Sequence, residues 1–128
     1  MTIKVPNEFP KHSAVDYRIA IIGEAPGRDE VSLLRPFVGE SGRLLWNSAS
    51  RNGLLRDACF VGNVCQNQPR DNDIKNFSWD GCEIQEGIAQ LTQDLKEFSP
   101  NLCLLLGNTP LKLFTGNTGI SSWRGSLL

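Results

Sequence analysis

The sequence predicts an α/β fold, a three-layer αβα arrangement on a short parallel central sheet. Three short apolar runs, each the length of a strand, alternate along the chain with segments of helical periodicity. Alternation of strand and helix produces parallel strands with helices on both faces of the sheet. The runs are almost continuously apolar, which is typical of strands covered on both faces.

The predicted strands run from Tyr17 to Ile22, from Ala58 to Val64 and from Leu102 to Leu106, the last as a buried strand. Gly23 ends the first strand abruptly, and the stretch from Gly23 to Glu40 is expected to be a loop. Ligands of such folds bind at the carboxyl ends of the strands. We therefore expect a site at the loops that follow the three strands.

Three helices are predicted between and after these strands. Ser41 can cap the first, which runs to about Asn52, where Gly53 supplies a left-handed stop; its apolar face carries Leu44, Leu45 and Ala49. The second covers 82–98 and has the clearest periodicity, with Ile84, Ile88, Leu91, Leu95 and Phe98 on one face.

Start and stop signals support the second and third helices. Asp80 with Glu83 resembles a capping box at the start of the second helix, and Pro100 ends it. Thr109 can cap a short third helix in which Pro110 takes the first position and which reaches Phe114. The polar segment from Cys65 to Trp79 is expected to lack regular structure.

The chain of 128 residues is at most one domain. We expect an irregular arm over 1–16, which contains Pro6 and Pro10, and a single domain over 17–128. No apolar run approaches a membrane span, and the start lacks the apolar stretch of a signal peptide, so a cytoplasmic location and no membrane partner are expected.

Charge is unevenly distributed along the chain, although the net charge is only −1. Residues 28–70 carry six arginines against four acids, and residues 71–97 carry seven acids against two lysines. A net charge near zero excludes a protein that binds nucleic acid by charge alone. The first region is the expected surface if DNA binds, and an ordinary solvated exterior is the alternative.

The most informative segment is Gly23-Glu24-Ala25-Pro26-Gly27, a rigid turn directly after a buried strand. Glycine lets the backbone approach a ligand, and such a turn directs peptide N–H groups into the crevice. The segment is neither a Walker loop nor the glycine motif of dinucleotide-binding proteins. A plain strand-exit turn is the alternative interpretation.

Two further residues suggest a site for a planar base. Phe37 follows a proline in a loop just before a helix, and Asn63 lies near the end of the second strand. An aromatic ring can stack on a base while an amide pairs with its edge. Alternatively, Phe37 anchors the helix in the core and Asn63 caps the strand.

These motifs resemble those of family 4 uracil-DNA glycosylases and the related domains of some phage-type DNA polymerases. The resemblance covers about residues 17–125, in order. It is carried by Gly23–Gly27 with Glu30, by Pro36-Phe37-Val38-Gly39 with Gly42, Leu44 and Leu45, by Gly62-Asn63-Val64, by Leu104-Leu105-Leu106-Gly107 and by Trp123-Arg124-Gly125.

The resemblance implies excision of uracil from DNA by hydrolysis of its N-glycosidic bond, with DNA as the partner. Phe37 would stack on the flipped uracil and Asn63 would discriminate it. The turn of Glu24, Ala25, Pro26 and Gly27 would line the pocket and help place water. Ala25 stands where other glycosylase families carry an Asp or Asn that activates water, so this loop contains no obvious general base. Glu24 and Glu30 are the nearby carboxylates.

Two departures from the family pattern bear on activity. Its members hold an iron–sulfur cluster on four cysteines, whereas here only Cys82 is in a ligand-like position, so no cofactor and no metal are expected. The other cysteines, Cys59, Cys65 and Cys103, are interpreted as core residues. Val31 also replaces an acid that often follows the position of Glu30.

The family also carries a His-Pro-Ser segment after a further strand, where the histidine stabilises the uracil anion. The only histidine here is His12, and the chain ends at Leu128. We therefore expect a domain that is incomplete at its C-terminus and impaired or inactive as a glycosylase. The alternative function is a non-catalytic module, binding DNA or a partner, of a phage-type DNA polymerase or another replication protein. A phosphate-binding α/β protein is a third hypothesis, weakened by the absence of a suitably placed Lys, Ser or Thr.

Overall fold

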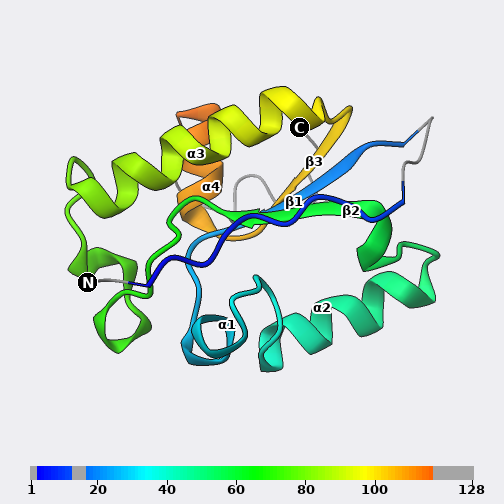
Figure 1. Cartoon of the computed structure of the whole chain (residues 1–128), viewed down its shortest axis with the longest axis horizontal. Helices are drawn as coiled ribbons and strands as arrows, with labels where there is room; N and C mark the ends of the chain where they lie inside the picture. The colour runs from blue at the N-terminus through cyan, green and yellow to red at the C-terminus, as the bar shows by residue number, and fades with distance from the viewer. Residues whose placement is uncertain (1–2, 13–16, 117–128) are drawn as a thin grey trace.

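Three parallel strands form the centre of the computed structural model, which describes residues 3–12 and 17–116 (Figure 1). They are β1 (Ile19–Gly23), β2 (Cys59–Asn63) and β3 (Leu102–Leu105), in the order β2-β1-β3. Ile19 of β1 pairs with Cys59 on one side and with Leu102 on the other. The predicted α/β class with a short parallel central sheet is confirmed.

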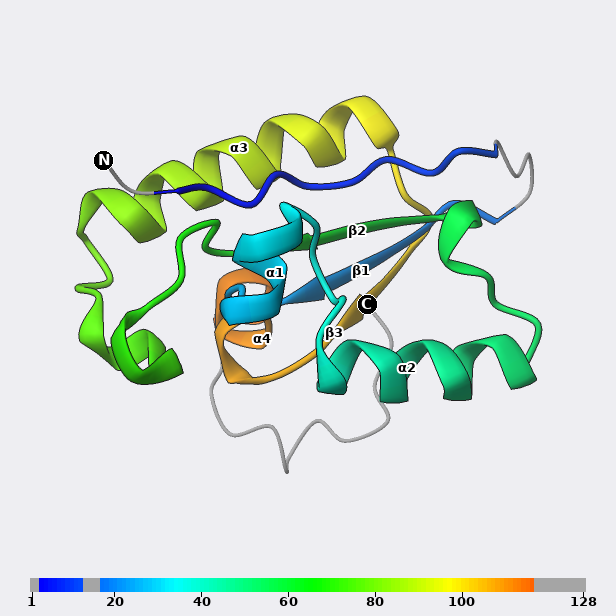
Figure 2. The ribbon, with the colours of Figure 1, turned by 60° about the horizontal axis from the view of Figure 1, so that its bottom comes forward.

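Helices cover both faces of this sheet (Figures 1 and 2). Ala20 and Ile22 of β1 pack in one apolar cluster with side chains of α3 (Cys82–Phe98) and α4 (Asn108–Thr115). Ile21 belongs to a second cluster on the opposite face, against α2 (Glu40–Arg51). Because successive strand residues point to opposite faces, β1 contributes to both cores, and Ala20, Ile21 and Ile22 are completely buried.

The bounds of α3 agree with its predicted range, but its N-cap differs. Ile84 and Leu91 are buried, as the periodicity predicts. The N-cap is Gly81, and no side chain caps the helix, so the predicted capping box of Asp80 and Glu83 is wrong. The Gly81 N–H donates to the Ser78 carbonyl (2.9 Å) in a turn that precedes the helix, so the N-cap lies one residue after Asp80 while the helix still begins at Cys82.

The start and the apolar face of α2 also differ from the prediction. Gly39, not Ser41, is the N-cap, and Leu44 is 67% exposed. Leu45 packs on the sheet as expected, together with a residue that the prediction left out, Trp46. At the other end of the helix Gly53 takes the left-handed conformation, with φ +83°.

Part of the segment predicted as a loop after β1 is helical. The helix α1 (Arg28–Leu33) has six residues and no buried side chain, so no apolar stripe marks it. Asp29 and Glu30 lie in its first turn, where acidic side chains favour a helix. Leu34 then ends the helix in the left-handed region, at φ 54°.

Three smaller predictions also need correction. The residues of β3 are only partly buried, because within the described part of the chain this strand pairs with β1 alone. Thr109 does not cap α4, since its hydroxyl donates to Glu24 instead. The polar segment between β2 and α3 contains two short 3-10 helices, η2 (Arg70–Asn72) and η3 (Ile74–Asn76).

The N-terminal arm lies beside β2 (Figure 2). Over residues 3–12 it forms two isolated antiparallel bridges, Lys4 with Asn67 and Glu8 with Val61. A third 3-10 helix, η1 (Arg56–Ala58), precedes β2. The segment Trp123-Arg124-Gly125 lies outside the described residues, and the boundary at residue 16 stays a prediction. None of the described helices has the length and apolar character to cross a membrane.

Candidate functional site

A cavity of about 320 Å³ opens at the carboxyl ends of β1 and β2. Small-molecule sites span about 300–1,000 Å³, and in α/β sheets they lie at this edge. All seven residues singled out from the sequence line it, namely Glu24, Ala25, Pro26, Gly27, Glu30, Phe37 and Asn63. The structure therefore brings together residues from the turn after β1, from β2, from α1 and from the loop before α2.

Gly23 allows Phe37 and Asn63 to meet in this cavity. A side-chain carbon at residue 23 would clash with Cζ of Phe37 and would lie 2.6 Å from Oδ1 of Asn63. The ring and the amide thus both pack against the bare backbone at the end of β1. Asn63 is 5% exposed, so its amide is fixed in the wall of the cavity.

The backbone of Phe37 is held in a conformation that a non-glycine residue rarely adopts, with φ 55°. Its carbonyl accepts from Trp46 Nε1 (3.0 Å) and from Arg56 Nη1 (2.8 Å), while Arg56 Nη2 donates to the Pro36 carbonyl (2.5 Å). A Cβ at Gly42 of α2 would overlap the Phe37 carbonyl. The Phe37 ring therefore stands on a loop that Trp46, Arg56 and Gly42 hold in place.

The carboxylate of Glu30 joins the turn after β1 to the Phe37 loop. Oε1 accepts from the Gly27 N–H (2.9 Å), and Oε2 accepts from the N–H groups of Val38 (3.0 Å) and Gly39 (2.6 Å). Burial acts to raise the pKa of Glu30, but the backbone hydrogen bonds from Gly39, Gly27 and Val38 outweigh it and lower that pKa below its usual value. The carboxylate is thus engaged by the protein backbone.

Glu24 occupies a different position in the cavity. Its carboxylate accepts a short hydrogen bond from the Thr109 hydroxyl (2.5 Å), and its carbonyl accepts from the Cys65 N–H (3.0 Å). Ala25, next to it, packs against the apolar cluster under α3. The Glu24 carboxylate therefore lines the cavity and accepts from the Thr109 hydroxyl, whereas the Glu30 carboxylate accepts from three backbone N–H groups.

Sequence reasoning missed four residues that complete the wall, Ser41, Gly42, Pro69 and Asn72. Asn72 ends η2 in the left-handed region (φ 55°) directly after Asp71 (φ 57°), and its Oδ1 accepts from Gln68 Nε2 (3.0 Å). Asn and Asp tolerate this conformation better than other side chains. An Asp-Asn pair after a proline was the available signal, but only the fold shows that this loop returns to the cavity.

The cysteines do not fit a four-thiolate cluster. Cys59 begins β2, at the end opposite the cavity, whereas Cys65 follows the strand. Burial raises the pKa of the thiols of Cys59, Cys65 and Cys103, which disfavours the thiolate that iron requires. Among residues 3–12 and 17–116, no three His, Cys, Asp or Glu side chains form a group that could hold a metal ion.

His12 lies far along the sheet from the cavity. Its backbone N–H donates to the carbonyl of Asp57 (3.1 Å), which lies shortly before β2 begins at Cys59. The cavity lies beyond the last residues of β1 and β2. His12 is the single histidine of the chain, so the cavity has no imidazole from these 128 residues.

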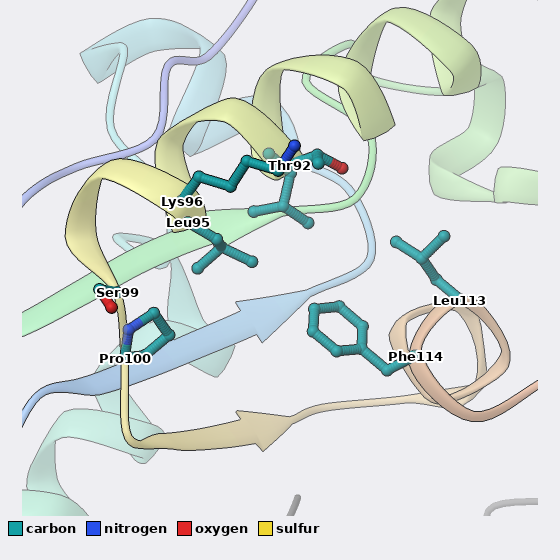
Figure 3. Close-up of a pocket in the computed structure, with 8 residues that line it drawn as sticks. Thr92, Leu95, Lys96, Ser99, Pro100, Leu113 and Phe114 are labelled. Atoms are coloured by element: carbon teal, nitrogen blue, oxygen red, sulfur yellow. The ribbon is translucent and has the colours of Figure 1, made fainter.

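A larger cavity, of about 480 Å³, separates α3 from α4 (Figure 3). Figure 3 shows Phe114 and Leu113 of α4 on one side and Leu95 and Pro100 on the other. The described residues around it include no carboxylate and no amide side chain. Its polar side chains are those of Thr92, Lys96 and Ser99, and none of the seven candidate residues lines it. The smaller cavity, at the carboxyl ends of the strands, is therefore the candidate site.

The fold and the cavity define an α/β protein with a ligand site at the carboxyl edge of a parallel sheet. The sequence model described as the uracil DNA glycosylase superfamily matches residues 9–127. The chain therefore belongs to the uracil-DNA glycosylase superfamily, and it is family 4-like.

Curated relatives support the same placement. A type-4 uracil-DNA glycosylase from Pyrobaculum aerophilum is 33% identical over 79% of this chain and 50% of its own length. Those from Thermotoga maritima and Sulfurisphaera tokodaii are 30% and 41% identical over 84% and 92% of this chain, and over 54% and 50% of their own lengths. The chain thus spans about half the length of the curated relatives it matches.

Proposed function

We propose that the cavity binds uracil flipped from DNA and that the domain takes part in excising it by hydrolysis of the N-glycosidic bond. The observation that carries this proposal is the convergence of the Phe37 ring and the Asn63 amide on Gly23. Family membership supports it. A planar base needs one aromatic face and one group with both a donor and an acceptor, and this pair supplies both.

The two carboxylates of the cavity take different roles in this proposal. Glu30 positions the pocket, because its oxygens accept three backbone N–H groups. Glu24 orients the attacking water, because Thr109 leaves part of its carboxylate facing the cavity. Expulsion of uracil creates positive charge on the sugar and negative charge on the base, and a fixed carboxylate on the sugar side stabilises the former.

The location of His12 favours a second candidate, a non-catalytic module that binds DNA or a partner, as in a phage-type DNA polymerase. No imidazole of this chain reaches the cavity. A donor to the leaving uracil contributes on the order of 3 kcal/mol, or about 100-fold in rate. By this reasoning the 128 residues recognise uracil more efficiently than they excise it.

Binding and excision are tested separately on one substrate, an oligonucleotide with a single uracil. Fluorescence anisotropy measures affinity, and alkaline cleavage after incubation measures excision. Stacking of a base on an aromatic ring contributes about 1–3 kcal/mol, so Phe37→Ala should weaken binding roughly 5- to 150-fold. Asn63→Ala should remove the preference for uracil over cytosine in the same sequence.

Leu44→Ala is the matched control, because Leu44 lies on α2 near the cavity but is 67% exposed. It should leave both measurements unchanged. Uracil-selective binding without strand scission would support the non-catalytic module. Equal affinity for uracil and cytosine oligonucleotides in the wild type would refute recognition by this cavity.

A further inference from the structure

The N-terminal arm is fixed to the domain by its backbone and by two contacts with α3. The Glu8 N–H donates to the Val61 carbonyl (2.8 Å), and the Val61 N–H donates back to Glu8 (2.9 Å). Lys4 forms an ion pair with Glu86 (2.8 Å), and Asn7 Nδ2 donates to Asp94 (2.8 Å). The arm therefore stays on β2 through contacts that do not involve the Glu8 side chain.

The Glu8 carboxylate lies between two arginines. Arg35 donates to both of its oxygens, from Nε (2.9 Å) and Nη2 (2.7 Å). Arg56 also donates to both, from Nε (3.2 Å) and Nη2 (3.4 Å). The side chain of Arg56 is only 15% exposed and that of Glu8 23%, so the charges are partly removed from water. A carboxylate that receives two guanidinium groups fixes the plane of both.

Arg56 links the Glu8 carboxylate to the loop that holds Phe37 in the cavity wall. Its guanidinium donates to the Phe37 and Pro36 carbonyls and lies 5.2 Å from the centre of the Trp46 ring. The Trp46 indole donates to the same Phe37 carbonyl. The left-handed conformation of Phe37 costs on the order of 1–3 kcal/mol and persists only where neighbouring groups hold it. Arg56 and Trp46 are those groups.

We propose that Glu8 is a positioning residue for the candidate site, which acts through Arg56 to set the Phe37 carbonyl and so the stacking ring. Its effect on uracil rests on the function proposed above. Glu8 does not line the cavity, and it lies one residue before the span matched by the superfamily model. Glu8 thus supports the site from just outside the matched region.

Glu8→Gln removes the negative charge and keeps a side chain of nearly the same size. Lys4→Gln is the matched control, because it removes an ion pair from the same arm at a point remote from Phe37. Arg56→Lys is a second variant, which keeps the positive charge but lacks the planar guanidinium fork whose separate nitrogens reach the two carbonyls and Glu8. Unfolding of the full chain in urea shows whether each variant is folded.

The first readout does not depend on activity. The indole N–H of Trp46 reports on the Phe37 carbonyl, and its NMR resonance is identified among the three tryptophans by Trp46→Phe. Glu8→Gln and Arg56→Lys should shift this resonance and speed its exchange with solvent. Lys4→Gln should leave it unchanged.

The second readout is binding of the uracil oligonucleotide. A small displacement of a positioned group costs up to about 100-fold, so Glu8→Gln should weaken binding roughly tenfold relative to Lys4→Gln. Glu8→Asp, which keeps the charge, should restore part of it. An unchanged Trp46 resonance in folded Glu8→Gln overturns the proposal. If the wild type fails to select uracil, the proposed function falls, while the Trp46 resonance still decides the role of Glu8.

Discussion

Gly23→Ala tests the geometry of the cavity at its narrowest point. The new methyl carbon would overlap Phe37 Cζ and lie 2.6 Å from Asn63 Oδ1 and 3.1 Å from Phe37 Cε2. Because non-bonded carbon atoms rest about 3.5–4.0 Å apart, the ring must move by roughly 1 Å. The backbone of residue 23 is not in the positive-φ region, so the substitution acts through these two side chains alone.

The expected effect on recognition is much larger than the effect on stability. A misplacement of about 1 Å costs on the order of 100-fold, or about 2.8 kcal/mol. Overpacking costs about 1–3 kcal/mol, but the Phe37 ring can yield into the open cavity, and alanine regains roughly 0.5–1 kcal/mol over glycine in a strand. The free energy of unfolding should therefore change by no more than about 1 kcal/mol.

Affinity for the uracil oligonucleotide and unfolding in urea are measured on the same preparations. Gly81→Ala is the control, since this glycine has φ −73° and lies at the N-cap of α3, outside the cavity wall. It should not alter affinity. Wild-type affinity in a folded Gly23→Ala variant would show that the ring and amide do not form the recognition surface.

Three further predictions concern the carboxylates around the site. Glu30→Gln leaves one acceptor oxygen for three backbone N–H groups, so it should lower the free energy of unfolding by about 1–2 kcal/mol. The neighbouring substitution Asp29→Asn should have little effect. Equal urea midpoints for Glu30→Gln and the wild type would contradict this prediction. Hydrogen bonds from Arg35 lower the pKa of Glu8 from 4.5 to about 2. Burial opposes this shift, and the hydrogen bonds of Arg56 and the charges of both arginines add to it. Because the folded-state pKa is depressed, the stability that Glu8 contributes should be complete above about pH 4.5 and lost as the pH falls toward 2. The difference in unfolding free energy between the wild type and Glu8→Gln should therefore shrink as the pH falls through this window. A difference that stays constant would argue against this prediction. Thr109→Val removes the hydroxyl that holds Glu24 and should slow excision more than it weakens binding. Single-turnover rates measure excision, and anisotropy measures binding. A larger loss of affinity than of rate would assign Glu24 to binding instead.

Several features of this protein were predictable from local sequence because local forces produce them. The apolar runs of β1 and β2 bury on both faces whatever the loops do, and the stripe from Ile84 to Phe98 specifies α3 to the residue. The rule that ligands bind beyond the strand ends then predicted the edge of the sheet at which Phe37 and Asn63 line one cavity.

Tertiary structure decided what depends on contacts distant in sequence. The helix α1 buries no side chain, so it has no periodicity to detect, and Glu30 was assigned to the site without its three backbone partners. Thr109 met the criteria for a cap, yet its hydroxyl bonds Glu24, 85 residues away. Glu8 lies in an arm without regular structure and reaches Arg56 over 48 residues. Charge pairing and backbone hydrogen bonding leave no periodic trace, because they are satisfied by whatever group the folded chain brings within reach.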